Sequence, residues 1–400
     1  MLDALREPRF RRLWLAGLCI NAARWMDFLV LGWLALELTD SPFLVGVAAF
    51  CRAAPMLAFG FPAGVLADRF DRGRVMVAVQ CLNLGATALL ALLFGAGLGS
   101  YGALVALAVL LGTGWAIDFP ARRTALYTLV GPARLTNAVS LESVSMQGSK
   151  MLGPILGGVL LARAGATGCY AALAALYAVA LVLLTGLGRH VAFPPVAAGE
   201  PVLASLAAGL REVRAQPLIR GVLLVTVLMN TLVFPYQHML PVFGREVLGI
   251  GPALLGLLVA AEGLGALTGS LAIAGWRGLA VHGAVFAGGS LTAAVLVVGF
   301  AFSPWYALSL PLQIAIGMAE SGFGTMQSAI VLLAAPDRAR GRAMGILSAC
   351  IGTQLFGTLW IGFFTSLVGA PIAAATGAAA AALLMLPVAS RVATRHPGRV

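Results

Sequence analysis

The sequence predicts an all-helical integral membrane protein, and three observations support this fold class. Of the 400 residues, 60% are hydrophobic and only 10% are charged, whereas a soluble chain carries about 25% charged residues. Apolar stretches of about 20 residues, the length that crosses a bilayer as a helix, recur along the whole chain. Membrane β-strands would instead give alternating segments of about ten residues. A soluble enzyme, a nucleic-acid-binding domain and a disordered protein are therefore excluded.

Twelve transmembrane helices are expected in order along the chain, separated mostly by short turns. Their expected ranges are 13–38, 42–66, 74–98, 101–121, 138–162, 168–188, 217–243, 252–275, 281–302, 306–334, 343–367 and 370–390. One longer connection follows the sixth helix, and its Leu203, Leu206 and Leu210 share a face, so we expect a helix along the membrane surface there. The predicted domains are a six-helix bundle at 1–188, a cytoplasmic linker at 189–216 and a second six-helix bundle at 217–400.

The basic residues predict the orientation of the chain. Most of the 26 lie in connections on the same side as the N-terminus, Arg122 among them, and only Arg163 and Arg245 lie on the opposite side. Cytoplasmic loops are enriched in Arg and Lys, so we expect both termini in the cytoplasm, in a bacterial-type inner membrane. The net charge of +11 then reflects topology, and no nucleic-acid partner is expected. Near the cytoplasmic helix ends, Asp118 and Glu142 are expected to be structural.

Several kinds of site have no sequence signal. The first apolar run exceeds 20 residues and has no small-residue cleavage site before it, so no cleavable signal is expected. The five cysteines lie within or beside apolar runs without metal-ligand spacing, and we interpret them as small buried hydrophobes. There is no phosphate-binding loop and no His-Glu-x-x-His motif. We therefore expect neither an enzyme, nor a metal site, nor a cofactor.

The two halves of the sequence resemble each other weakly. Residues 41–46 open the second predicted helix, and the similar residues 251–256 open the eighth. Residues 132–138 before the fifth helix likewise resemble 337–343 before the eleventh. Two similar halves in the same orientation are typical of transporters that rock about a site near the bilayer midplane.

The turn after the second helix carries a motif of Gly, three residues, then Asp-Arg. Its residues are Gly64, Asp68, Arg69 and Arg72. This turn resembles the signature loop of the major facilitator superfamily, in which such contacts hold one conformation. Asp71 replaces the family glycine and Gly73 replaces a basic residue, so the set of salt bridges is left open. The alternative is a generic basic cytoplasmic loop.

The fifth helix carries a Gly-x4-Gly-Pro-x2-Gly-Gly pattern. The pattern is formed by Gly148, Gly153, Pro154, Gly157 and Gly158. It resembles the antiporter motif of the same superfamily, which implies exchange and not co-transport; ordinary small-residue packing is the alternative. Within the superfamily, residues 37–42, 64–69 and 153–158 look most similar to the enterobactin-exporter and macrolide-efflux branch. The resemblance implies two six-helix halves related by a pseudo-two-fold axis.

Six ionisable residues lie near the centres of predicted helices, where each costs at least about 2.5 kcal/mol. They are Arg24, Asp27, Arg52, Lys150, Glu262 and Glu320. Three are positive and three negative, so we expect them to compensate one another in a polar interior. The third, sixth, ninth and twelfth helices carry no interior charge, and in the superfamily these four face lipid.

The same residues are the candidates for coupling and binding. Asp27, Glu262 and Glu320 are candidate proton carriers, with Asp27 first; the alternative for Asp27 is a permanent pair with Arg24 on the same helix face. Arg52 and Glu262 occupy equivalent repeat positions and either meet or bind elsewhere. The candidate substrate-binding residues are Arg24, Arg52, Lys150, Trp25, Trp115, Tyr236 and His238.

These features predict a secondary transporter that works by alternating access. The leading hypothesis is a proton-coupled antiporter that exports a small amphiphile, a siderophore or a drug, with the proton gradient as its energy source. A multidrug or macrolide pump without a siderophore role and a lipid flippase are the alternatives, followed by a membrane enzyme or receptor. We expect a monomer whose partners are the small-molecule substrate and membrane lipid.

Overall fold

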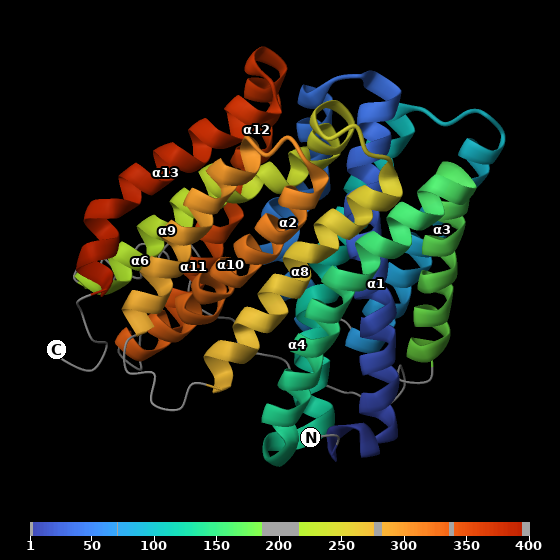
Figure 1. Ribbon diagram of the computed structural model, residues 1–400. Helices are drawn as coiled ribbons and strands as arrows, with labels where there is room; N and C mark the ends of the chain where they lie inside the picture. Colours follow the sequence, from blue (N-terminus) through green and yellow to red (C-terminus); the bar gives the residue numbers. More distant parts are fainter. Residues whose placement is uncertain (1–2, 70, 186–215, 276–281, 336–339, 394–400) are drawn as a thin grey trace. The chain divides into compact units, whose positions relative to one another are not determined.

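The computed structural model describes residues 3–69, 71–185, 216–275, 282–335 and 340–393. Within these ranges the regular structure is entirely helical and contains no strand (Figure 1). The predicted all-helical membrane fold is therefore confirmed. Of the predicted linker, residues 189–215 lie outside the described ranges.

The N-terminal elements are η1 (Asp3–Arg6), α1 (Pro8–Thr39), α2 (Pro42–Arg69), α3 (Arg72–Gly95) and α4 (Tyr101–Thr185). The first three long helices follow the predicted ranges closely, whereas α4 also includes the predicted connections 122–137 and 163–167. Local chemistry sets several of the ends. Asp40 ends α1 in the left-handed conformation, with φ 47°, and the Asp71 side chain accepts a hydrogen bond from the Arg74 backbone at 2.8 Å at the start of α3.

The long element α4 contains three of the predicted helices. Its 85 residues would extend about 130 Å as a straight helix, several times the thickness of a bilayer. Its apolar parts are 101–119 and 141–185. The second part is itself too long for one crossing, and Gly165 has a positive φ of 62°, a conformation that glycine adopts readily. Two crossings joined at Gly165 account for its length.

The C-terminal elements are less regular. They are α6 (Pro217–Leu228), η2 (Met229–Val233), η3 (Phe234–Met239), α7 (Leu240–Val242), η4 (Phe243–Val247), α8 (Pro252–Gly275), α9 (His282–Ala301), α10 (Tyr306–Ala334), α11 (Arg340–Gly352), α12 (Gln354–Val368) and α13 (Ala370–Ala393).

Two predicted helices of this half are interrupted. The predicted helix 217–243 changes to π and 3₁₀ geometry from Met229 onward, because Pro235 and Pro241 supply no backbone N–H. The predicted helix 343–367 is divided at Thr353, whose hydroxyl donates to the Cys350 carbonyl at 2.7 Å. Each stretch still forms one candidate membrane span, at Pro217–Val247 and Ala343–Val368, so the predicted spans are confirmed although their α-helical geometry is interrupted.

Nine helical stretches within the described residues are long and apolar enough to cross a membrane. α10 is 29 residues long but is not among the nine, because polar side chains such as Gln313, Glu320 and Gln327 lower its hydropathy. Pro42–Met56 counts only as a shorter apolar helix, and the side chains of 57–69 lie outside the described part. The predicted total of twelve stays a prediction.

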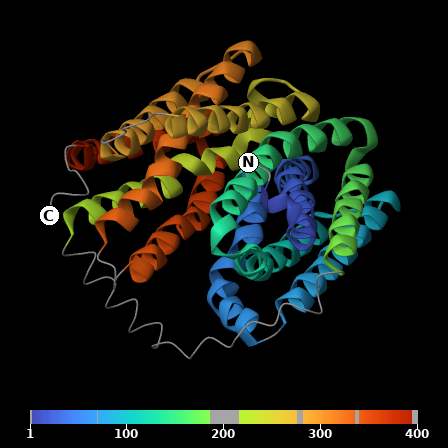
Figure 2. The same cartoon turned by 90° about the horizontal axis from the view of Figure 1, so that it is seen from below.

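The chain divides into two compact units. One comprises Met1–Ala197 and Ile250–Ala260, and the other comprises Ala198–Gly249 and Ala261–Val400. In the first unit, α1 packs mainly against α4, and α3 does the same. Figure 2 shows α1 in dark blue, end-on, with the teal and green turns of α4 beside it. In the second unit, α9 packs against both α10 and α13.

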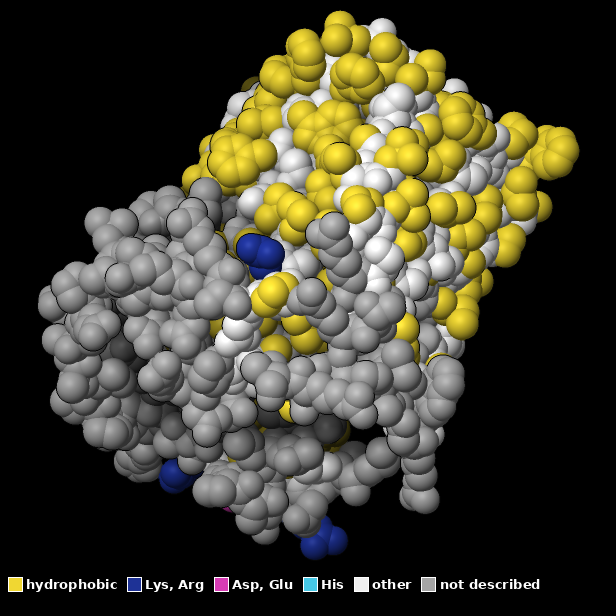
Figure 3. Space-filling view, turned by 90° about the vertical axis from the view of Figure 1, so that its left-hand side faces the viewer, with side chains coloured by type: hydrophobic (Ala, Val, Ile, Leu, Met, Phe, Trp, Pro, Cys, Tyr) yellow, Lys and Arg dark blue, Asp and Glu magenta, His cyan; other side chains and the backbone are white. Residues whose placement is uncertain are grey.

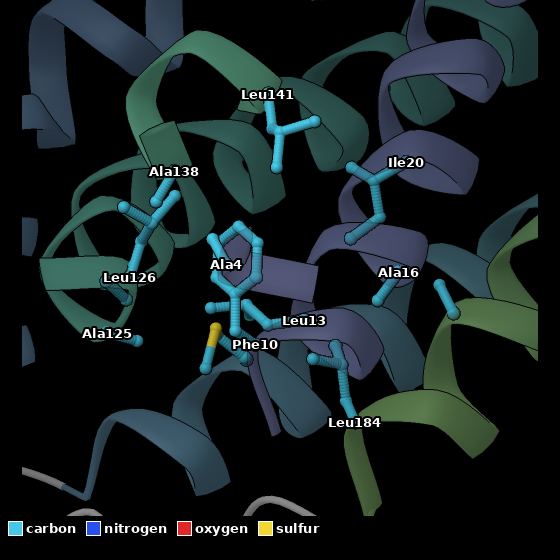
Figure 4. Close-up of a cluster of buried hydrophobic side chains, with 13 residues drawn as sticks. Ala4, Phe10, Leu13, Ala16, Ile20, Ala125, Leu126, Ala138, Leu141 and Leu184 are labelled. Carbon is cyan, nitrogen blue, oxygen red and sulfur yellow. The ribbon is translucent and has the colours of Figure 1, made fainter. Parts of the chain in front are cut away.

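The interior and the surface are both apolar, as expected in lipid. A cluster at the start of α1 joins Phe10, Leu13 and Ile20 to Leu141 of α4 and to Leu184 near its end (Figure 4). Large side chains are also exposed, including Leu92 and Val182 at 70% and 72%. The face in Figure 3 shows mostly hydrophobic side chains where the surface is described. These side chains would contact lipid tails. Apolar surface in contact with lipid avoids the unfavourable free energy of contact with water.

Candidate functional site

The interior of the N-terminal unit contains a buried ion pair between α1 and α2. Arg52 Nε lies 3.0 Å from Asp27 Oδ2, and both side chains are largely shielded. The pairing that the sequence left open is thus formed by Arg52, and not by Arg24 on the same helix as Asp27. The planar guanidinium of an arginine forms directional hydrogen bonds with a carboxylate. Arg52 reaches Asp27 from the neighbouring helix α2.

Arg24 binds aromatic rings instead of a carboxylate. Its guanidinium lies 3.9 Å from the Trp115 ring centroid and 5.8 Å from that of Trp25. Among the residues that the structure describes, no carboxylate lies within salt-bridge distance of Arg24. Cation–π contacts of this kind are worth up to about 2 kcal/mol when desolvated, so the charge of Arg24 is only partly stabilised.

Lys150 also lies near this aromatic group. Its Nζ is 5.4 Å from the Trp25 ring centroid, and Trp25 packs edge-to-face against Phe28 with centroids 5.7 Å apart. The structure therefore brings together four of the predicted substrate-binding residues, Arg24, Lys150, Trp25 and Trp115, and it places Arg52 beside Asp27.

A second buried network surrounds Arg122. Arg122 Nε lies 3.1 Å from Asp118 Oδ2, and Arg122 Nη1 lies 3.1 Å from Glu142 Oε1. Gly17 of α1 leaves room for this guanidinium, since a Cβ there would lie 2.6 Å from Nη1. The sequence placed Arg122 in a connection on the cytoplasmic side, and the structure places it within α4 with its side chain 3% exposed. The spacing of Asp118 and Arg122, four residues apart on one helix, was the signal that could have indicated it.

A chain of side-chain amides leads from this network to α3. Gln80 Nε2 donates to Asp118 Oδ1 at 3.0 Å, and Asn83 Nδ2 donates to Gln80 Oε1 at 3.3 Å. Asn83 Oδ1 is buried and accepts no hydrogen bond. Asn83, Asp118 and Arg24 line a small cavity together with Gly114, Trp115 and Tyr177.

The interior of the C-terminal unit places two carboxylates beside one amide. Gln237 Nε2 donates to Glu262 Oε1 at 3.0 Å and to Glu320 Oε1 at 3.4 Å. Glu262 is 1% exposed and Glu320 is 8% exposed. Gln237 lies in the 3₁₀ segment η3, so the irregular backbone of this region directs the amide between α8 and α10. Gln237 was not identified as a candidate from the sequence, because its side chain is uncharged and the candidates were chosen among ionisable and aromatic residues.

Tyr236 and His238, the other two predicted binding residues, lie on either side of Gln237 in the chain. Tyr236 is buried and donates to Gln313 Oε1 at 2.9 Å, while its ring meets Phe300 edge-on at 5.8 Å between centroids. His238 is half-buried in the same segment η3. The hydroxyl of Tyr236 therefore has a hydrogen-bond partner within the protein, Gln313.

The glycines of the antiporter-like pattern lie at close helix contacts. A Cβ on Gly153 would lie 2.8 Å from Trp25 Cβ, and one on Gly157 would lie 3.1 Å from Met26 Cγ. Gly158 packs against the start of α8, where a Cβ would contact Pro252 and Gly256, and Gly256 in turn packs against Pro154. Gly148 has open space beside it. Of the loop motif, the side chains of Asp68, Arg69 and Arg72, and the surroundings of Gly64, lie outside the described part.

No group of three or more potential metal ligands occurs among the residues that the structure describes. The polar interior consists of ion pairs, amides and aromatic faces within long apolar helices. This arrangement defines the class: an integral membrane protein with polar groups held inside its helical bundles, as in secondary transporters. The chain belongs to the transmembrane secretion effector family of the major facilitator superfamily, whose model matches residues 1–397.

Curated relatives support this assignment. The multidrug efflux pump Tap of Mycolicibacterium fortuitum is 26% identical, with 87% of each chain covered. The enterobactin exporter EntS of Shigella boydii is 27% identical over 88% of this chain and 85% of its own. The staphyloferrin A transporter of Staphylococcus aureus is 24% identical over 62% of both chains. The predicted resemblance to the enterobactin-exporter branch is confirmed, and the chain is a bacterial membrane protein.

Solved structures share the fold. A peptide transporter, POT, in complex with sulfate has a TM-score of 0.78 at 12% identity, covering 98% of this chain and 96% of its own. A bacterial homologue of the human lysosomal transporter Spinster, inward-facing and unoccupied, has a TM-score of 0.69 at 15% identity, covering 97% and 96%. At such identities the likeness shows the major facilitator fold.

Proposed function

We propose that the protein exports a small amphiphilic molecule across the inner membrane in exchange for protons, by alternating access. The observation that carries the proposal is the pair of buried glutamates, Glu262 and Glu320, that share the amide of Gln237. Export is supported by the relatives, an efflux pump and an enterobactin exporter. Both the family and the relatives are transporters, and no enzymatic activity is proposed.

The two glutamates are well suited to hold a proton. Two charged carboxylates within reach of one amide repel each other. Binding one proton removes the repulsion and leaves a carboxyl group that can donate a hydrogen bond. A substrate that enters this site can therefore displace the proton, or the proton can displace the substrate, which is the requirement for exchange.

Asp27 takes a different role in this proposal. Its carboxylate is paired with Arg52 at 3.0 Å, so proton uptake at Asp27 requires the pair to separate. A substrate anion that binds Arg52 would separate it. Asp27 thus remains a coupling residue, but its proton uptake depends on the substrate.

The substrate-binding residues combine charge with aromatic faces. Arg24 and Lys150 contact the Trp25 and Trp115 rings, a surface that suits an acidic group attached to rings. Arg52 belongs to the same proposed set, and Tyr236 and His238 are proposed binding residues within the C-terminal unit. We propose a monomer with both termini in the cytoplasm, because the basic residues are concentrated on that side.

The decisive experiment uses proteoliposomes with an imposed pH gradient, with enterobactin and ethidium as the transported probes. We expect accumulation to depend on the gradient and to lose that dependence in Glu262→Gln and Glu320→Gln. The matched control is Glu246→Gln, a glutamate that is exposed in η4. Transport that ignores the gradient in the unaltered protein would exclude proton coupling, and full coupling in both glutamine variants would exclude this pair.

The substrate class is tested in cells. The relatives suggest two candidates, a siderophore and a drug. A deletion strain that secretes less siderophore at unchanged drug susceptibility supports the first candidate, and the opposite result supports a multidrug pump. If neither changes, movement of a fluorescent lipid between leaflets in the same proteoliposomes would favour a flippase.

A further inference from the structure

The N-terminal unit contains a directional chain of side-chain hydrogen bonds that the proposed function does not use. An ionised carboxylate only accepts hydrogen bonds, so Asp118 obliges Gln80 to donate with Nε2. The Gln80 carbonyl then accepts from Asn83 Nδ2. The remaining polar atom, Asn83 Oδ1, is left without a donor.

Asn83 also lines a small cavity, together with Arg24. The innermost space has room for about one water molecule, so it accepts one oxygen atom of a ligand. Gly114, which also lines this cavity, leaves room for the Asn83 side chain, because a Cβ there would lie 2.5 Å from Asn83 Oδ1. With Asp118 ionised, the cavity presents one acceptor, Asn83 Oδ1, and the donors of Arg24. A hydroxyl group, which both donates and accepts, satisfies both.

Protonation of Asp118 reverses the chain. The protonated carboxyl donates to Gln80 Oε1, the Gln80 amide turns to donate to Asn83 Oδ1, and Asn83 Nδ2 then points toward the cavity. The two links of the chain, Asp118 to Gln80 and Gln80 to Asn83, are kept with their directions reversed, and no covalent bond changes except the proton on Asp118. The cavity then presents only donors, from Asn83 and Arg24, and it prefers an oxygen that only accepts, such as that of a carboxylate.

We propose that Asp118, Gln80 and Asn83 form a proton-controlled relay that switches this cavity between a hydroxyl-binding state and a carboxylate-binding state. The relay adds a proton site to those of the proposed function, and its operation does not depend on them. The ligand chemistry is that of an organic hydroxyl or carboxylate group, and water occupies the hydroxyl state when no ligand is present.

The surroundings of Asp118 can accommodate the proton. Two carboxylates, Asp118 and Glu142, share one guanidinium, Arg122, so this group carries one excess negative charge. When Asp118 is protonated, Arg122 keeps Glu142 as its partner. The described charged or titratable groups around Asp118 are Arg122 and Glu142 of α4, Arg24 of α1, Arg52 of α2 and Tyr177 of α4.

Nuclear magnetic resonance tests the relay directly. In the full chain, with asparagine and glutamine labelled with ¹⁵N, the side-chain amide signals of Gln80 and Asn83 are followed as the pH is changed. We expect both to shift with one common midpoint, and neither to shift in Asp118→Asn. Gln327, whose amide donates to Thr226 at 2.7 Å in the other unit, is the internal control. Independent midpoints for the two amides, or titration that persists in Asp118→Asn, would overturn the relay.

Calorimetric binding tests the ligand preference, with benzoate and benzyl alcohol as matched probes. Between about pH 9 and pH 6 benzoate stays ionised, and we expect its affinity relative to benzyl alcohol to rise by about tenfold, the worth of one hydrogen bond. In Gln80→Met and Asn83→Leu the ratio is expected to be independent of pH.

Two glycine variants separate the cavity from general effects on the fold. Gly114→Ala fills the space and is expected to weaken both probes, whereas Gly102→Ala on the same helix, with nothing within 4 Å, is expected to leave both unchanged. No binding of either probe, or a pH-independent ratio in the unaltered protein, would overturn the proposal. Because neither measurement involves transport, failure here is distinguishable from failure of proton-coupled export.

Discussion

The interiors of the two units differ in the groups that contact their buried carboxylates. In the N-terminal unit, arginines meet carboxylates directly: Arg52 with Asp27, and Arg122 with Asp118 and Glu142. In the C-terminal unit, Gln237 joins two glutamates, and Gln313 and Gln327 pair with hydroxyl groups. The weak repeat between the halves therefore preserves the helical frame while the polar chemistry has diverged.

This difference separates two functions of buried polar groups. An ion pair resists a change of protonation, because either partner alone would be an uncompensated charge. A carboxylate beside an amide changes its charge more easily, since the amide can bind both forms. The N-terminal interior therefore holds mainly paired charges, with Asp118 as the carboxylate that also contacts an amide, that of Gln80, and the C-terminal interior holds carboxylates that share an amide.

The largest expected effect is the loss of Arg122. Arg122→Met leaves Asp118 and Glu142 buried without their cation, and we expect the free energy of unfolding to fall by about 3–5 kcal/mol. Thermal unfolding in detergent measures this, with exposed Arg220→Met as the matched control. If both substitutions lowered the free energy of unfolding equally, the ion pairs of Arg122 would not contribute to stability.

The packing of α1 against the antiporter-like pattern gives the next effect. Gly153→Ala places a methyl group 2.9 Å from the Met26 backbone nitrogen, and overpacking of this kind destabilises by about 1–3 kcal/mol. Gly148→Ala, in open space on the same pattern, is expected to be neutral or slightly stabilising because alanine favours helix. If both variants unfold at the temperature of the unaltered protein, tight packing is not what these glycines provide.

The Asp27–Arg52 pair is tested by a double-mutant cycle. Asp27→Asn and Arg52→Gln each leave one buried charge, whereas the double variant leaves none. We therefore expect a coupling energy of about 1–3 kcal/mol in the free energy of unfolding. A coupling energy near zero would show that the contact between Asp27 and Arg52 does not contribute to the stability of the fold.

The smallest effect is expected in the C-terminal unit, where neutral contacts replace ion pairs. Tyr236→Phe removes the hydrogen bond to Gln313 but keeps the ring against Phe300, and we expect a loss of about 1 kcal/mol. Unfolding in detergent measures it alongside Phe300→Leu, which keeps the hydrogen bond. A loss as large as that of Arg122→Met would remove the distinction between the two interiors.

Local sequence determined most of the fold. Apolar length, low charge and the two glycine-containing motifs predicted a helical membrane protein of the major facilitator superfamily, because hydropathy and helix geometry depend on neighbouring residues. The interruptions at Met229 and Thr353 were not predicted. They depend on hydrogen bonds and proline positions within otherwise continuous apolar runs.

The sequence by itself also determined which charges lie inside the membrane, since a charge within an apolar stretch is visible in one dimension. Only the tertiary structure decided their partners. Asp27 binds Arg52 and not the nearer Arg24, and Gln237 joins glutamates that lie 25 and 83 positions away. Such pairings depend on which helix faces meet, and contacts between distant segments leave no trace in the local pattern.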